Sequence, residues 1–192
     1  MPNDDAPDTV TVLVVDDEKE VADAYALRLR GYCDVQTAYG GREALSIVDE
    51  STVDIVLLDR HMPDMSGDDV LAELTDQGFD GRVVMVTAVD PDFDVLEMPF
   101  DDYLCKPVDR EDVRATIDQQ RRVLAYEVLG EYFSVESKRA VVEAETSAGQ
   151  RREHDGYSEI ATQVTRLEER ARRLLDDADV LDRFEQVGRE SF

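Results

Sequence analysis

A short apolar strand that ends in an aspartate constrains this chain most. Residues 53–58 read Val-Asp-Ile-Val-Leu-Leu and run directly into Asp59, and a turn-forming segment with Pro63 and Gly67 follows. A short apolar run bounded by turn residues is typical of a strand in the core of a sheet. Ligands of open α/β sheets bind beyond the carboxyl ends of the strands. Asp59 therefore stands where a ligand would bind, although an aspartate after a strand commonly only caps a turn.

Strands and helices alternate over the first two thirds of the chain. Continuous apolar runs predict buried strands, and apolar residues spaced by three and four predict helices between them. The predicted strands are 10–15, 35–39, 53–58, 82–87 and 101–105. The predicted helices are 20–30, 42–49 and 68–75, with a short helix at most in 91–98. A last helix is predicted to be capped by Asp109 and to run through Val113, Ile117 and Leu124. This alternation predicts an α/β fold with a doubly wound, five-stranded parallel sheet.

Polar residues stand at the carboxyl ends of four predicted strands. Asp16 and Asp17 follow the first strand, Asp59 follows the third, Thr87 closes the fourth and Lys106 follows the fifth. In a doubly wound sheet these ends share one rim. Carboxylates packed together repel one another unless a cation lies among them. Oxygen ligands without a nearby His or Cys cluster indicate Mg²⁺, which needs few carboxylates and keeps several waters.

Each of these residues also has a purely structural interpretation. Asp16 and Asp17 could cap the first helix, Lys106 could be a solvated charge, and Thr87 could be an ordinary strand residue. Their joint occurrence at four strand ends favours a site. A metal held by carboxylates can present a phosphoryl group to an aspartate, and aspartyl phosphate is an established covalent intermediate. A lysine ammonium binds phosphate, and a threonine hydroxyl can bind another phosphoryl oxygen.

The sequence resembles the receiver domain of two-component response regulators, the CheY-like family. The matching residues are Val14-Val15-Asp16-Asp17-Glu18, Leu58-Asp59 with Met62-Pro63 and Gly67, Thr87-Ala88, and Tyr103 with Lys106-Pro107. The resemblance covers about residues 9–125 and implies the strand order 2-1-3-4-5.

The resemblance also implies roles for individual residues. Asp59 would accept a phosphoryl group from a histidine of a sensor kinase. Asp17 and Asp59 would bind Mg²⁺ directly, Asp16 mostly through water, and the backbone carbonyl of His61 would be a further metal ligand. The His61 imidazole would be a bystander. Lys106 would pair with the phosphoryl group, and its bond to the following proline would be cis, which an X-Pro bond adopts at low cost.

Two more residues are implied to form a switch. The Thr87 hydroxyl would move toward the phosphate and the Tyr103 side chain would turn inward behind it, so that phosphorylation biases a bistable surface. A half-buried strand aromatic is the plain alternative for Tyr103. One feature departs from the family: Thr87 and Lys106 are only 19 positions apart, fewer than in the chemotaxis receiver. The helix between them must therefore be short or distorted, and the usual receiver dimer cannot be assumed.

Residues 126–192 are predicted to be helical and contain no proline. Residues 132–148 read as a helix and residues 149–156, with two glycines, as a turn. A heptad-like apolar seam follows, formed by Tyr157, Ile160, Val164, Leu167, Ala171, Leu174, Ala178 and Leu181. We expect a helical hairpin or coiled coil as a second domain (126–192) after the first (9–125). The helices could fold on one another or on the receiver, pair between two chains, or dock a partner.

This second region resembles the HalX output domain that follows receivers in halophilic archaea. The resemblance rests on its length, on its helical pattern rich in Tyr, Glu and Arg, and on the preceding stretch 92–98. The sequence shows no helix-turn-helix signature, no zinc spacing and no basic stripe with aromatics. It also shows no kinase, cyclase or phosphodiesterase motif. Whether the output region binds DNA or protein stays open.

Composition bounds the cellular setting. The chain has 46 acidic and 21 basic residues and a formal net charge of -25. This charge fits a salt-rich cytoplasm, where screening is strong, or simply an acidic soluble protein. Cys33 and Cys105 lie far apart and read as free thiols of a reducing compartment. The N-terminus lacks the features of a signal peptide, and no apolar run is long enough for a membrane span. We expect a cytoplasmic protein without a membrane partner.

These patterns together predict a response regulator. A sensor histidine kinase would phosphorylate Asp59 with Mg²⁺, and the helical region, which could form a homodimer, would regulate transcription. The alternative is a phosphorylation-controlled protein-protein adaptor without DNA binding. An enzyme of the haloacid hydrolase type needs a second acid beside the nucleophile and a covering insertion, but Arg60 and His61 follow Asp59 and no insertion is evident. A pseudo-receiver needs a broken acidic cluster, and here the cluster is complete. We therefore expect no enzymatic activity beyond the receiver's own phosphorylation and dephosphorylation.

Overall fold

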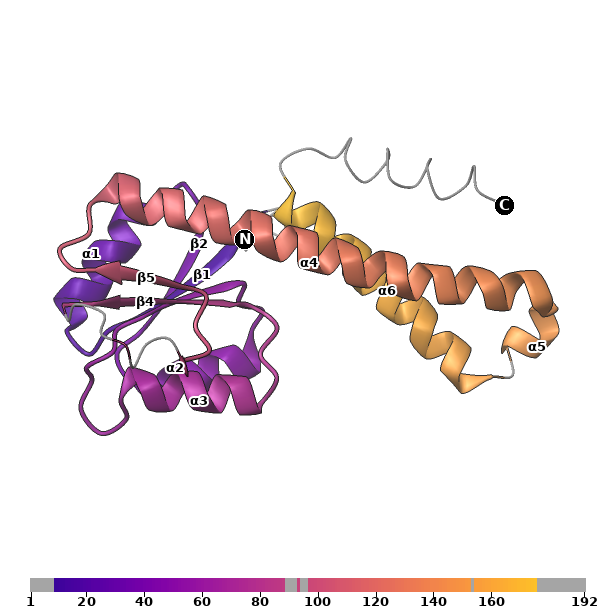
Figure 1. Cartoon of the computed structure of the whole chain (residues 1–192), viewed down its shortest axis with the longest axis horizontal. Helices are drawn as coiled ribbons and strands as arrows, with labels where there is room; N and C mark the ends of the chain where they lie inside the picture. Colours follow the sequence, from indigo (N-terminus) through magenta and orange to yellow (C-terminus); the bar gives the residue numbers. More distant parts are fainter. Residues whose placement is uncertain (1–8, 89–92, 94–96, 153, 176–192) are drawn as a thin grey trace, which may run out of the picture. The chain divides into compact units, whose positions relative to one another are not determined.

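The computed structural model describes residues 9–88, 93, 97–152 and 154–175 (Figure 1). They belong to two compact units. The sheet unit comprises Thr9–Arg121, and the helical unit contains the described chain from Arg122 onward. The predicted domain boundary between residues 125 and 126 stays a prediction.

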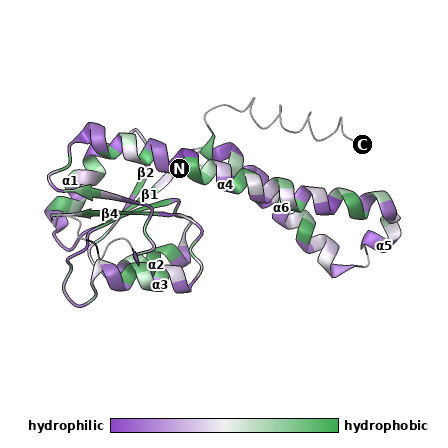
Figure 2. Ribbon diagram, in the orientation of Figure 1, coloured by the Kyte–Doolittle hydropathy of each residue, from purple (hydrophilic) through white to green (hydrophobic). Residues whose placement is uncertain are grey.

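The sheet unit contains five parallel strands in the order β2-β1-β3-β4-β5. Their bounds are β1 Thr11–Val15, β2 Asp34–Ala38, β3 Ile55–Leu58, β4 Arg82–Thr87 and β5 Asp102–Cys105. Both the doubly wound α/β class and the strand order predicted from the sequence are confirmed. Strands β1, β3 and β4 lie inside the sheet, and nearly all of their side chains are buried. Figure 2 shows the hydrophobic colour along β4, one of these inner strands.

Helices cover both faces of this sheet (Figure 1). Helices α2 (Gly41–Glu50) and α3 (Gly67–Asp76) lie on one face, and α1 (Lys19–Leu29) and the start of α4 lie on the other. The core under α2 and α3 includes Leu13, Val56, Leu58, Leu71 and Met85. Burying one such side chain stabilises the fold by roughly 1.5–3 kcal/mol. The short helix expected in 91–98 falls mostly on 91, 92 and 94–96, which lie outside the described residues.

Helix α4 spans Arg110–Glu145 and contributes to both units. Asp109 caps it as predicted, because its Oδ1 accepts the N–H groups of Glu111 at 2.8 Å and Asp112 at 2.9 Å. The sequence predicts a helix through Leu124 and another over 132–148, and the structure joins them into one helix. A single glycine, Gly130, stands in the joining segment, and its cost of about 1 kcal/mol relative to alanine does not end the helix.

The helical unit is an antiparallel hairpin of the second part of α4 and α6 (Asp155–Leu174), which lie side by side (Figure 1). Gln163 Nε2 of α6 donates to Glu131 Oε1 of α4 at 3.0 Å. The buried side chains include Val128, Leu129, Tyr132 and Val135 on α4 and Val164, Leu167, Ala171 and Leu174 on α6. The predicted seam is thus used within one chain, the first of the three alternatives. Its last members, Ala178 and Leu181, lie outside the described residues.

The turn predicted for residues 149–156 is wrong in part, because it begins with the short helix α5 (Ala148–Arg152). Ser147 explains the difference through a capping box with Gln150. The Ser147 N–H donates to Gln150 Oε1 at 3.0 Å, and the Gln150 N–H donates to Ser147 Oγ at 3.4 Å. These bonds give hydrogen-bond acceptors to N–H groups that otherwise lack one at the start of a helix. Within the part of the chain that the structure describes, no helix is long and apolar enough to cross a membrane.

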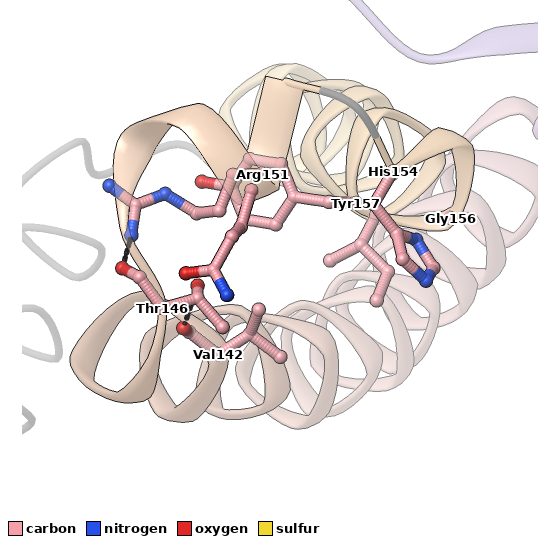
Figure 3. A pocket seen from close by; sticks show the side chains of 8 residues that line it. Val142, Thr146, Arg151, His154, Gly156 and Tyr157 are labelled. Atoms are coloured by element: carbon pink, nitrogen blue, oxygen red, sulfur yellow. Dashed lines mark hydrogen bonds between the residues drawn. The ribbon is translucent and has the colours of Figure 1, made fainter.

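The end of the hairpin, where α4, α5 and α6 meet, is hollowed into a small pocket (Figure 3). The Arg151 guanidinium donates to the Thr146 carbonyl and lies 5.8 Å from the centre of the Tyr157 ring. Thr146 Oγ1 in turn donates to the Val142 carbonyl at 2.5 Å. The bonds of Arg151 and Thr146 therefore help to hold the turn between the two long helices.

Candidate functional site

Asp16 and Asp59 are neighbours at the carboxyl edge of the sheet. Val15 of β1 pairs with Leu58 of β3, so the residues that follow these two strands leave the sheet side by side. Both are buried, with 3 % of Asp16 and 8 % of Asp59 exposed. Buried carboxylates are costly unless they are paired and hydrogen-bonded. Their burial therefore requires partners within the site.

Lys106 is the shared partner. Its Nζ donates to Asp16 Oδ2 at 2.6 Å and to Asp59 Oδ1 at 2.8 Å. Burial lowers the pKa of Lys106, but the hydrogen bonds to both carboxylates outweigh it, so the pKa is raised above its usual value. One ammonium between two carboxylates leaves a surplus of negative charge. The bond from Lys106 to Pro107 is cis, which confirms that expectation.

Backbone N–H groups hold the remaining oxygens of the two carboxylates. Asp59 Oδ2 accepts from His61 N at 2.9 Å, and Asp16 Oδ1 accepts from Glu18 N at 2.9 Å. Charge-assisted bonds of this kind orient a carboxylate firmly. His61 itself is exposed, and Asp17 is half-buried beside the pair.

Thr87 and Tyr103 come from two neighbouring strands, β4 and β5. Thr87 is only 1 % exposed and ends β4, and its carbonyl accepts the N–H of Lys106 at 2.7 Å. Tyr103 lies on β5 in register with Met85 of β4. It is half-buried, and its ring centroid lies 5.6 Å from that of Phe100. The structure thus joins Asp16, Asp59 and Lys106 by direct bonds and links Thr87 to them through its backbone.

The donor set fits a magnesium ion in part. Two adjacent carboxylates suffice chemically, because Mg²⁺ is usually bound by one or two carboxylates and several waters. Among the described residues, however, no three His, Cys, Asp or Glu side chains gather closely enough to hold a metal. Asp17 does not complete the pair, and the Lys106 ammonium lies against both carboxylates. The predicted ligand set of Asp16, Asp17, Asp59 and the His61 carbonyl stays a prediction.

The segment after Asp59 requires a glycine. A Cβ on Gly67 would lie 2.3 Å from the carbonyl oxygen of Asp59 and 2.8 Å from Cα of Arg60. The Gly67 N–H donates to the Arg60 carbonyl at 2.9 Å, and Ser66 starts α3 with a capping box to Asp69. The loop therefore returns tightly onto Asp59, and the start of α3 fixes its far end.

Sequence reasoning missed two residues of α1 that border the site. Arg28 Nη1 donates to the Val108 carbonyl at 2.9 Å, two residues after Lys106, and its guanidinium lies 5.4 Å from the centre of the Tyr25 ring. Burial raises the pKa of Tyr25, while the charges of Lys106 and Arg28 oppose that rise. No local pattern could have found these residues, because the contact joins positions 80 apart.

Comparison with known proteins decides the family. Residues 12–118 match the family model described as response regulator receiver domain. The chain belongs to the response regulator receiver family. Residues 122–188 of this response regulator match the HalX domain. Both resemblances inferred from the sequence are confirmed.

Individual relatives agree with this assignment. A Haloferax volcanii protein named "Putative transcriptional regulator" is 44% identical over 155 residues, which cover 80% of this chain and 26% of that protein. The chain thus spans about a quarter of the length of that relative. A signal receiver domain from Vibrio parahaemolyticus shares the fold, with 24% identity and a TM-score of 0.61 over 64% of this chain and 98% of that one. The BeF3-activated receiver domain of DrrB is 28% identical, with a TM-score of 0.53 over 58% and 96% of the two chains.

Proposed function

We propose that this response regulator is switched by phosphorylation of Asp59. The observation that carries the proposal is the buried contact of the Asp59 and Asp16 carboxylates with the Lys106 ammonium. An acceptor carboxylate needs a nearby cation that can move onto the incoming phosphoryl oxygens, and Lys106 already touches the acceptor. The negative surplus beside it suits a divalent cation.

The donor would be a phosphohistidine of a sensor kinase. A carboxylate oxygen of Asp59 attacks the phosphorus, an O–P bond forms, and the N–P bond breaks while the imidazole nitrogen keeps the electron pair. Lys106 then exchanges its bond to Asp59 for bonds to the phosphoryl oxygens. Bound Mg²⁺, held by Asp16, Asp17, Asp59 and the His61 carbonyl, would supply the charge that draws the phosphoryl group to the carboxylate.

The signal would leave through β5 and α4. The Thr87 hydroxyl would bind a phosphoryl oxygen, and Tyr103 would follow it inward. Asp102, next to Tyr103, accepts from Gln120 Nε2 of α4 at 2.9 Å through its Oδ2. Gln120 is buried, so this bond ties a change in β5 to the helix that continues into the helical unit.

The output would be transcriptional regulation. The Haloferax volcanii relative, which is named a transcriptional regulator, supports this proposal. The chain would act as a signalling protein without an enzymatic output. The second candidate, a protein-protein adaptor without DNA binding, is supported by the sequence pattern of the helical region, which carries no basic stripe with interleaved aromatics.

Phosphorylation of a matched pair of variants tests the proposal. Asp59→Asn and Asp64→Asn make the same chemical change five positions apart, and Asp64 is exposed at a positive φ of 65° that asparagine accepts well. With phosphoramidate as donor and Mg²⁺ present, intact-mass spectrometry should show one phosphoryl group on the wild type and on Asp64→Asn and none on Asp59→Asn. Removing Mg²⁺ with EDTA should abolish uptake.

Labelling of Asp59→Asn at the wild-type level would disprove the assignment of the acceptor. Uptake that EDTA leaves unchanged would disprove the metal requirement while leaving the acceptor intact.

A further inference from the structure

Arg60 directly follows Asp59, and its guanidinium binds the start of α3. Its Nε donates to Asp68 Oδ1 at 3.1 Å and to Asp68 Oδ2 at 3.3 Å, and its Nη2 donates to Oδ2 at 3.2 Å. The side chain of Arg60 is only 14% exposed, and that of Asp68 is 44% exposed. A forked arginine-carboxylate contact fixes direction as well as distance. The pair therefore joins the end of β3 to the second residue of α3.

The backbone of Arg60 makes a second link to the same helix. Its carbonyl oxygen accepts the N–H of Gly67, the first residue of α3, at 2.9 Å. Residues 61–66 thus form a loop whose two ends are bonded to each other. Arg60 closes this loop twice, once through its carbonyl and once through its side chain.

One peptide group connects this closure to Asp59. The Arg60 carbonyl and the His61 N–H belong to the same planar unit, so they can only turn together. The carbonyl end of this unit accepts from Gly67, and the N–H end donates to Asp59 Oδ2 at 2.9 Å. The other oxygen of Asp59, Oδ1, accepts from Lys106 at 2.8 Å. The orientation of the peptide group between residues 60 and 61 therefore helps to set the orientation of the Asp59 carboxylate.

We propose that Arg60, held by Asp68, is a positioning residue for the phosphoryl acceptor. It fixes the peptide group that holds Asp59 Oδ2, so that the carboxylate stays aimed at the incoming phosphorus. The inference rests on the proposed function, because it assigns Arg60 to the reaction of Asp59. Without the guanidinium contact the peptide group turns more freely, and Asp59 spends less time in a reactive orientation.

A plainer role for the ion pair is to stabilise the start of α3. Asp68 lies in the first turn of that helix, where a carboxylate is favourable even without a partner. That role alone predicts a weaker helix start and an unchanged rate of phosphoryl uptake. The two roles can be separated, because His61 N–H reports the peptide group and Val70 N–H, which donates to the Ser66 carbonyl at 3.0 Å, reports the first turn of α3.

Uptake rates of four variants test the positioning role. The full chain in molar KCl with Mg²⁺ is treated with phosphoramidate at one fixed concentration and followed by intact-mass spectrometry. Arg60→Gln should lower the rate constant of uptake about tenfold, and Asp68→Asn should lower it by less. The double variant should be no slower than Arg60→Gln, because Asp68 is assigned no part except holding Arg60. Asp76→Asn makes the same chemical change at the exposed end of α3 and should react like the wild type.

Hydrogen exchange of the chain without donor or metal gives a second readout. Measured by NMR, Arg60→Gln should speed exchange of the His61 amide about tenfold or more and leave that of Val70 unchanged. An equal rise at both amides would show that the pair only holds the helix start, and would overturn the inference.

The uptake experiment also separates this inference from the proposed function. Equal uptake by the wild type and Arg60→Gln, or a double variant slower than Arg60→Gln, would overturn the positioning role and leave Asp59 as the acceptor. Failure of the wild type to take up phosphate would instead overturn the proposed function, and this inference with it.

Discussion

The sheet unit and the helical unit differ in what they bury. Among the described residues, all buried polar and charged side chains belong to the sheet unit, namely Asp16, Asp54, Asp59, Thr87 and Gln120. The buried side chains of the helical hairpin are apolar or, for Tyr132, amphipathic. Buried charge is costly and persists where partners or function hold it. The buried charged groups that could serve chemistry therefore lie in the sheet unit, whereas the helical hairpin buries apolar side chains.

The two units also differ in how their residues meet. Asp16, Asp59 and Lys106 come from three strands whose pairing joins distant parts of the chain, and 90 positions separate the first from the last. In the hairpin, α4 and α6 instead pack on each other through one apolar stripe on each helix. A defect in the sheet unit should consequently reach the site, while a defect in the hairpin should stay local.

The largest expected difference concerns core truncation. Ile55→Ala removes a fully buried side chain from β3, which has a strand on each side, and Leu167→Ala removes one that is 2% exposed from α6. Such changes destabilise by about 2–5 kcal/mol. We expect Ile55→Ala near the upper end and Leu167→Ala near the lower end, because two helices can shift to close a cavity.

Urea unfolding in molar KCl, followed by circular dichroism, measures both losses. A larger loss in the free energy of unfolding for Leu167→Ala than for Ile55→Ala would contradict this expectation, because it would show that the hairpin is the more rigidly packed unit.

Replacing Gly67 and Gly130 by alanine should change the free energy of unfolding in opposite directions. Alanine at Gly67 would clash with backbone atoms of Asp59 and Arg60, so Gly67→Ala should destabilise by roughly 1–3 kcal/mol and slow phosphoryl uptake. Alanine at Gly130 meets open space on a helix, so Gly130→Ala should stabilise by about 0.5–1 kcal/mol. The same urea titration with uptake rates checks both. Normal uptake by Gly67→Ala would show that the loop after Asp59 can yield.

The smallest expected effects concern the two capping boxes. Ser66 caps α3, whose Val70, Leu71 and Leu74 are buried, so Ser66→Ala should cost about 1 kcal/mol. Ser147 caps the short, largely exposed α5, and Ser147→Ala should cost at most a few tenths of that, because fraying of α5 uncovers little apolar surface. Equal losses in urea unfolding would indicate that α5 supports the hairpin more than its exposure suggests.

Local patterns were sufficient for much of this protein. The apolar runs before Asp16, Asp59 and Thr87 predicted their strands to within two residues, and Asp109 was recognised as a helix cap. Other features could not be predicted from patterns of neighbouring residues. Residues 149–156 contain glycines and read as a turn, but Ser147 and Gln150 start a helix there. Arg28 reaches Val108 only because α1 lies beside the segment after β5.

By itself, the sequence determined the alternation of strands and helices, the positions of the acidic residues and lysine at strand ends, and the apolar stripe of α6. These are properties of neighbours in the chain, and periodicity records them. Only the tertiary structure decided that the Lys106 ammonium lies against both Asp16 and Asp59, that Gly67 must lack a side chain, and that the α6 stripe is covered by α4 of the same chain. Those outcomes depend on contacts between distant segments, whose geometry no local spacing specifies.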